Sequence, residues 1–109
     1  MRIDFKDRKL KNLCENDSAA KTTLGQDSAK KLRSRLSDLE AAASVAELAA
    51  GRPHPLAGKR EGEFALDLAG GCRLVFAPDH DPQPMRDDGR VDWSRVTCVR
   101  IVYIGDYHD

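Results

Sequence analysis

The apolar residues follow one period before Gly51 and another after it, and this change limits the folds open to the chain. Between positions 29 and 43 they step by three and four residues, which keeps them on one face of a helix. These residues are Ala29, Leu32, Leu36, Leu39 and Ala43. Beyond Gly51 apolar and polar residues alternate, as they do in half-buried strands. Helices followed by strands predict an α+β protein.

Other segments complete a prediction of two N-terminal helices packed on one face of an antiparallel sheet. Residues 2–5 alternate and predict a short strand, and residues 6–16 predict a short amphipathic helix. Gly25 and Asp27 mark the start of the longer helix. Residues 44–51 predict one further helical turn, which begins at a capping-box spacing.

A "GG" dipeptide between two alternating segments predicts a β-hairpin. A two-residue loop would place Arg73 on the apolar face of the hairpin. A three-residue loop over positions 70–72 instead pairs Leu68 with Leu74 and keeps the apolar face continuous, so we expect this register. Arg73 then points away from the helices and lies beside Asp67.

The last predicted strand, "VTCVRIVYI", is apolar on both faces except at Arg100, which indicates a central position in the sheet. If this strand runs antiparallel to residues 73–77, its C-terminal end lies beside Arg73. The tail residues Asp106, Tyr107 and His108 then approach the same edge of the open sheet face. An acid, a phenol, an imidazole and a guanidinium would meet there.

Length and composition predict one soluble domain, residues 1–109, with 40% hydrophobic and 33% charged residues. No apolar run is long enough to span a membrane, and we see no secretory signal. The three cysteines are therefore expected to be reduced thiols in a cytoplasmic protein, and their spacing matches no zinc site. Residues 1–60 hold 13 basic and 8 acidic side chains, whereas residues 61–109 hold 5 and 10.

Five of those acids fall between positions 79 and 92, within a segment (78–95) that also holds three prolines. We name residues 78–95 the acidic excursion. It is expected to be irregular, exposed to solvent and dispensable for folding.

His54 stands between two prolines, which hold it in a stiff, extended segment, and Lys59 and Arg60 follow it. A histidine exchanges protons near neutral pH, and an arginine holds two phosphate oxygens at once. Together with Arg73 and the tail, these residues suit acid–base chemistry on a phosphodiester without a metal or another cofactor. Each has a structural alternative: a loop histidine, a docked terminus, or a simple pair between Arg73 and Asp67.

The combination "HPLAGKREGEFALDL…CRLVF…YIGDYH", with "RIDFKDRKLKNLCEN" at the start, resembles the RelE/ParE toxin superfamily of bacterial toxin–antitoxin systems. It is most similar to the HigB-type killer proteins, and the resemblance covers nearly the whole chain. The resemblance implies a microbial RNase-like (RelE-like) fold. It also implies an mRNA interferase, a metal-independent endonuclease that cleaves messenger RNA in the ribosomal A site and so inhibits translation. The implied partners are the mRNA and the ribosome, a HigA-like helix-turn-helix antitoxin, and operator DNA through that antitoxin.

Carried over by position, the resemblance makes His54 the histidine of the "HPL" motif and Arg73 the arginine of the sheet. Asp106, Tyr107 and His108 match the terminal motif. In this interpretation His54, Asp106 or His108 handles protons, Arg73 stabilises the growing phosphate charge, and Tyr107 stacks on a base or orients the phosphate.

The sequence departs from the family at two places. Ala57 stands where the family has a lysine, and Lys59 is a candidate to replace that charge, with Arg60 beside it. The acidic excursion is longer than in short members, and its acids oppose binding to a ribosome. Two alternatives stay open: a ParE-like toxin that poisons gyrase without nuclease activity, and a degenerate member that only binds its antitoxin.

Overall fold

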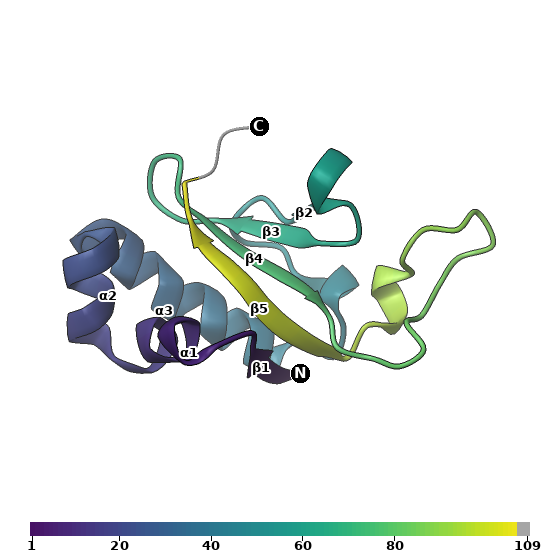
Figure 1. Ribbon diagram of the computed structural model, residues 1–109, viewed down its shortest axis with the longest axis horizontal. Helices are drawn as coiled ribbons and strands as arrows, with labels where there is room; N and C mark the ends of the chain where they lie inside the picture. The colour runs from purple at the N-terminus through teal and green to yellow at the C-terminus, as the bar shows by residue number, and fades with distance from the viewer. Residues whose placement is uncertain (107–109) are drawn as a thin grey trace.

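The computed structural model describes residues 1–106 and shows, over that range, helices packed against a five-stranded sheet (Figure 1). The α-helices are α1 (Arg8–Glu15), α2 (Asp17–Leu24) and α3 (Gln26–Ala41). The strands are β1 (Arg2–Phe5), β2 (His54–Pro55), β3 (Phe64–Asp67), β4 (Arg73–Pro78) and β5 (Cys98–Gly105). The 3₁₀ turns are η1 (Val45–Glu47), η2 (Gly58–Arg60) and η3 (Trp93–Arg95). The predicted α+β class is confirmed.

The sheet is mixed, so the prediction of an antiparallel sheet was wrong at one edge. The strand order is β1-β5-β4-β3-β2, and β1 runs parallel to β5 whereas the other neighbours are antiparallel. Alternation in a sequence identifies a strand but not its partner or direction. As predicted, β5 is central, because it lies between β1 and β4.

The N-terminal region holds three helices where two were predicted, because α2 lacks a clear apolar stripe. Ala20 is its one buried residue. Local capping defines α2 instead: the Asn16 side chain accepts a hydrogen bond from the Ala19 amide at 3.2 Å. Gly25, with φ of 88°, ends the helix and lets the chain turn into α3.

The helical stripe of α3 packs on the sheet as its spacing predicts, with Ala29, Leu32 and Leu39 all buried. Their partners on the sheet belong to one apolar cluster, whose central members are Leu66, Leu74, Phe76, Val99 and Ile101. Apolar burial of this kind stabilises the fold by about 25 cal/mol per Å² of area removed from water. The helices thus cover one sheet face and leave the other for the site.

The β3–β4 hairpin has the predicted facing but a different register. Leu66 pairs with Leu74 and Asp67 pairs with Arg73, so the predicted pair of Leu68 with Leu74 was wrong. The Leu68 amide instead donates to the Cys72 carbonyl at 2.9 Å. The difference is a shift by two residues, which leaves every side chain on its predicted face.

The acidic excursion is less independent than its composition indicates. It projects from one end of the molecule (Figure 1), but Val91 is only 8% exposed and belongs to the apolar cluster. His80 Nε2 accepts hydrogen bonds from the amides of Thr97 and Cys98 at 3.1 and 3.2 Å. The segment is thus exposed over most of its length, as expected, but Val91 and His80 anchor it to the rest of the protein. That it is dispensable for folding stays a prediction. Within residues 1–106, no helix has both the length and the apolar character needed to cross a membrane.

Candidate active site

The sheet face opposite the helices, here named the open face, carries two rows of paired residues. Residues directly opposite each other in a ladder share a face. The pairs of His54 with Ala65, Ala65 with Val75 and Val75 with Tyr103 therefore form one row across four strands. The pairs Asp67–Arg73 and Arg73–Gly105 form the next row. The prediction that Arg73 lies on this face beside Asp67 is confirmed.

A β-bulge in β5 puts Tyr103 on the open face. Phe76 pairs with Ile101, and its neighbour Val75 pairs with Tyr103, so Val102 is the extra residue. Without the bulge, strict alternation would place Tyr103 with Ile101 in the apolar cluster beneath the helices. The bulge is invisible in the sequence, which is why sequence reasoning missed this tyrosine.

Asp67 holds two arginines in place on the open face. Its carboxylate accepts from Arg52 Nε at 2.8 Å and lies 2.9 Å from Arg73 Nε. Burial alone would raise the pKa of Asp67, but a hydrogen bond from Arg52 and the positive charges of Arg73 and Arg52 keep it below its usual value. The structural alternative for Arg73, a pair with Asp67, is thus correct. Even so, one carboxylate serves two guanidinium groups, and a net positive charge remains.

The orientation of the His54 ring is set by the backbone. Its Nδ1 lies 2.7 Å from the carbonyl oxygen of Arg52. Because a carbonyl oxygen only accepts, Nδ1 carries the hydrogen, and Nε2 of the neutral ring presents its lone pair. The side chain is half-buried on β2, at the start of the row that ends at Tyr103. This is the arrangement that a general base requires.

A second cation covers the other end of that row. The Arg60 guanidinium lies 4.7 Å from the centre of the Tyr103 ring, and Glu63 holds it through an ion pair of 2.9 Å. Lys59 is exposed, and its side chain makes no hydrogen bond or ion pair among residues 1–106. Arg60 rather than Lys59 therefore supplies positive charge above the open face.

Asp106 is the last residue that the structure describes, and it directly follows the end of β5. Gly105 pairs with Arg73, and the Asp106 carboxylate packs so closely on Gly71 that a Cβ there would lie 2.7 Å from Oδ2. The Tyr103 hydroxyl donates to the Asp106 carbonyl oxygen at 3.4 Å. Tyr107 and His108, the other two predicted tail residues, lie outside the described residues.

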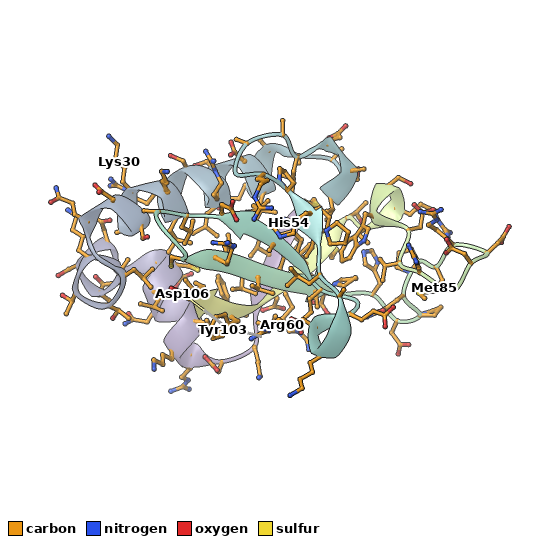
Figure 2. All side chains as sticks on the ribbon, turned by 90° about the horizontal axis from the view of Figure 1, so that it is seen from above. Lys30, His54, Arg60, Met85, Tyr103 and Asp106 are labelled. Atoms are coloured by element: carbon orange, nitrogen blue, oxygen red, sulfur yellow. The ribbon has the colours of Figure 1, made fainter. Side chains whose placement is uncertain are left out.

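Figure 2 looks onto the open face and shows His54, Arg60, Tyr103 and Asp106 together over the sheet. Of the predicted site residues, His54 and Arg73 thus lie on the open face, Arg60 lies over Tyr103, and Asp106 lies beside Gly71. Sequence reasoning missed Arg52 and Tyr103 as site residues. The alternation in "GRPHP" was the available signal for Arg52, since residues two apart in an extended segment share a side.

The open face suits a bound phosphodiester. Three arginines stand around a floor made by Ala65 and Val75, both fully buried, and His54 stands at its edge. The described residues include no group of three or more histidine, cysteine, aspartate or glutamate side chains placed to hold a metal ion. No protein-family model matches the chain, and no curated protein matches it significantly.

Proposed function

We propose that this protein is a toxin of the RelE/ParE superfamily, of the HigB type, which cleaves messenger RNA in the ribosomal A site without a metal ion. The observation that carries the proposal is the geometry of His54. Its Nε2 lone pair is directed by the bond from Nδ1 to the Arg52 carbonyl, on the same face as the Arg52–Asp67–Arg73 cluster. The resemblance of "HPLAGKREG" and "DYH" to the family motifs supports the same conclusion.

In the proposed reaction, the 2′-hydroxyl of one nucleotide attacks its own 3′-phosphate. His54 Nε2 accepts the hydroxyl proton, and the bond from phosphorus to the 5′-oxygen of the next nucleotide breaks. Arg73 and Arg52 stabilise the negative charge that develops on the phosphoryl oxygens. A proton from the C-terminal segment, through Asp106 or His108, neutralises the departing 5′-oxygen. The products are a 2′,3′-cyclic phosphate and a 5′-hydroxyl.

The test is cleavage of an mRNA positioned on ribosomes with an empty A site, read by mapping the new 5′ ends. His54→Gln is expected to lower the cleavage rate by about 10²–10⁴-fold, because it removes the proton acceptor. Glu40→Gln, an exposed change on α3 away from the open face, is the matched control. Wild-type protein that leaves the mRNA intact, or a His54→Gln variant that cleaves at the wild-type rate, would overturn the proposal.

The proposed partner of the free protein is a small antitoxin encoded beside it. Three cations of α2 and α3 support this partner, since Lys21, Lys30 and Lys31 are exposed away from the open face (Lys30 is labelled in Figure 2). Arg35, on the same helix, is half-buried and lies 3.0 Å from Asp38. Expression without the antitoxin is expected to arrest growth by stopping protein synthesis. An arrest that begins with DNA synthesis would point to a gyrase poison.

A further inference from the structure

A groove with a volume of about 550 Å³ lies between the loop that follows β2 and the acidic excursion. Its lining includes Pro55, Leu56 and Glu61 on one side, and Met85, Arg90 and Trp93 on the other. The volume falls within the range of small-ligand sites, about 300–1,000 Å³. In Figure 2 the Met85 end of the molecule lies beyond the sheet, past Arg60.

The charged side chains of the groove are two arginines and one acid. Arg86 and Arg90 line it, together with Glu61. Three acids of the excursion, Asp87, Asp88 and Asp92, instead line a neighbouring hollow, which shares Met85 and Arg86 with the groove. Asp88 pairs with Arg86 at 3.2 Å, so Arg90 is the cation of the groove that is left for a ligand.

Two side chains give the groove an apolar wall. Trp93 is the only tryptophan in the chain. Its ring packs on Phe64, with 4.8 Å between the two ring centres. Met85 is 44% exposed, and within residues 1–106 it is the one large hydrophobic side chain that is exposed. An anchored aromatic ring beside an adaptable thioether is a surface on which a nucleobase stacks favourably.

Two charged side chains at the groove have no partner among the described residues. The Arg90 guanidinium makes no hydrogen bond or ion pair within residues 1–106, since only its backbone is bonded. The same holds for the Glu61 carboxylate within that range. Arginine recognises a phosphate, and a carboxylate accepts a hydrogen bond from the exocyclic amino group of a base.

The groove begins at β2, the edge strand that also carries His54. Pro55 lines the groove and directly follows His54, and successive residues of a strand point to opposite faces. The groove therefore lies around the edge of β2 from His54. A polynucleotide with a phosphodiester at His54 would pass around this edge to place a neighbouring nucleotide in the groove.

We infer that the groove is a subsite for one nucleotide of the RNA strand, next to the cleaved phosphodiester. The base stacks on Trp93 and Met85, Arg90 binds its phosphate, and Glu61 favours bases with an amino group over uracil. This inference rests on the proposed function, and it names the part of the protein that contributes sequence preference.

Tryptophan fluorescence tests the subsite directly, because Trp93 is the only tryptophan. The probes are short RNA oligonucleotides with a 2′-O-methyl group at the reacting position, which cannot be cleaved, and which differ at one base. Wild-type protein is expected to show a saturable fluorescence change. Arg90→Ala is expected to weaken binding by about tenfold, and Glu61→Gln to remove the preference over uracil. Lys11→Ala, an exposed change on α1, is the matched control and is expected to bind as the wild type does.

The outcomes separate the subsite from the nuclease. A fluorescence change that depends on Arg90, in a protein that does not cleave mRNA on ribosomes, supports the subsite and contradicts the proposed function. Cleavage at wild-type rate and with unchanged sequence preference in both Arg90→Ala and Glu61→Gln contradicts the subsite and leaves the proposed function in place. Oligonucleotides that bind without changing the fluorescence of Trp93, or that do not bind at all, also overturn the subsite.

Discussion

Replacing Gly71 with alanine is expected to displace the Asp106 carboxylate without changing the stability of the fold. A Cβ on Gly71 would lie 2.7 Å from Asp106 Oδ2 and 2.9 Å from Cγ, whereas ordinary contacts begin at 3.4 Å. The carboxylate must therefore retreat by about 0.7 Å or turn to another rotamer. Asp106 is exposed, so this movement is easy.

The free energy of unfolding is expected to change little in Gly71→Ala. A shifted rotamer costs about 0.5–1.5 kcal/mol, and the smaller entropy of the unfolded chain returns about 0.4–1 kcal/mol. The neighbouring Gly70→Ala is the matched control, which is expected to lower the stability and to leave the cleavage rate unchanged. Gly70 has φ of 58° and no described atom within 4 Å of an added Cβ. Alanine there costs about 1–2 kcal/mol in backbone strain and leaves Asp106 in place.

Thermal unfolding and mRNA cleavage on ribosomes, measured on both variants, give the test. Gly70→Ala is expected to melt about 4–8 °C lower per kcal/mol lost and to cleave normally below its transition. Gly71→Ala is expected to keep its melting temperature and to lose about tenfold or more in rate, because a displacement near 1 Å costs up to about 10²-fold. In an Asp106→Ala background, Gly71→Ala is expected to have no further effect. Normal cleavage by Gly71→Ala would refute a role for the carboxylate at this position.

Three further changes test the fold and its pH dependence. Asp67→Asn is expected to destabilise the protein by about 1 kcal/mol at pH 7. Because the pKa of Asp67 is lowered on folding, its contribution is present above its usual value of 3.8 and is lost as pH falls through the folded value. The gap between wild type and variant in urea unfolding is therefore expected to close in acid, and a constant gap would contradict this. His80→Phe removes the acceptor for two backbone amides, so we expect a loss of about 1–3 kcal/mol and faster hydrogen exchange at Thr97 and Cys98. Leu39→Ala, at a fully buried position, is expected to cost about 2–5 kcal/mol by chemical denaturation, and less than 1 kcal/mol would place Leu39 outside the core.

Local periodicity predicted the parts of the fold that depend on which side of an element is apolar. The stripe on α3 and the facing of the β3–β4 hairpin both follow from residues a few positions apart. Arg73 lies opposite Asp67 for the same reason, since burial of Leu66 and Leu74 forces the alternate residues outward. The hairpin register was missed by two positions because a shift by two leaves the apolar face unchanged.

Features that depend on distant partners were not predictable in this way. The helix α2 is defined by its caps rather than by an apolar stripe, and the parallel pairing of β1 with β5 joins segments at opposite ends of the chain. Arg52 belongs to the site through its contact with Asp67, which lies on β3. Such contacts leave no periodic signal in either segment.

The sequence by itself determined the α+β class, the buried face of each main element and the residues able to handle a phosphodiester. It did so because hydrophobic burial acts on local patterns and because the chemistry of a side chain is intrinsic to its type. Only the tertiary structure decided which of those residues meet. One extra residue at Val102 turns Tyr103 out of the core and beneath Arg60, and the missing side chain of Gly71 gives Asp106 its place. Both depend on strand pairing, which is set by the packing of the whole sheet.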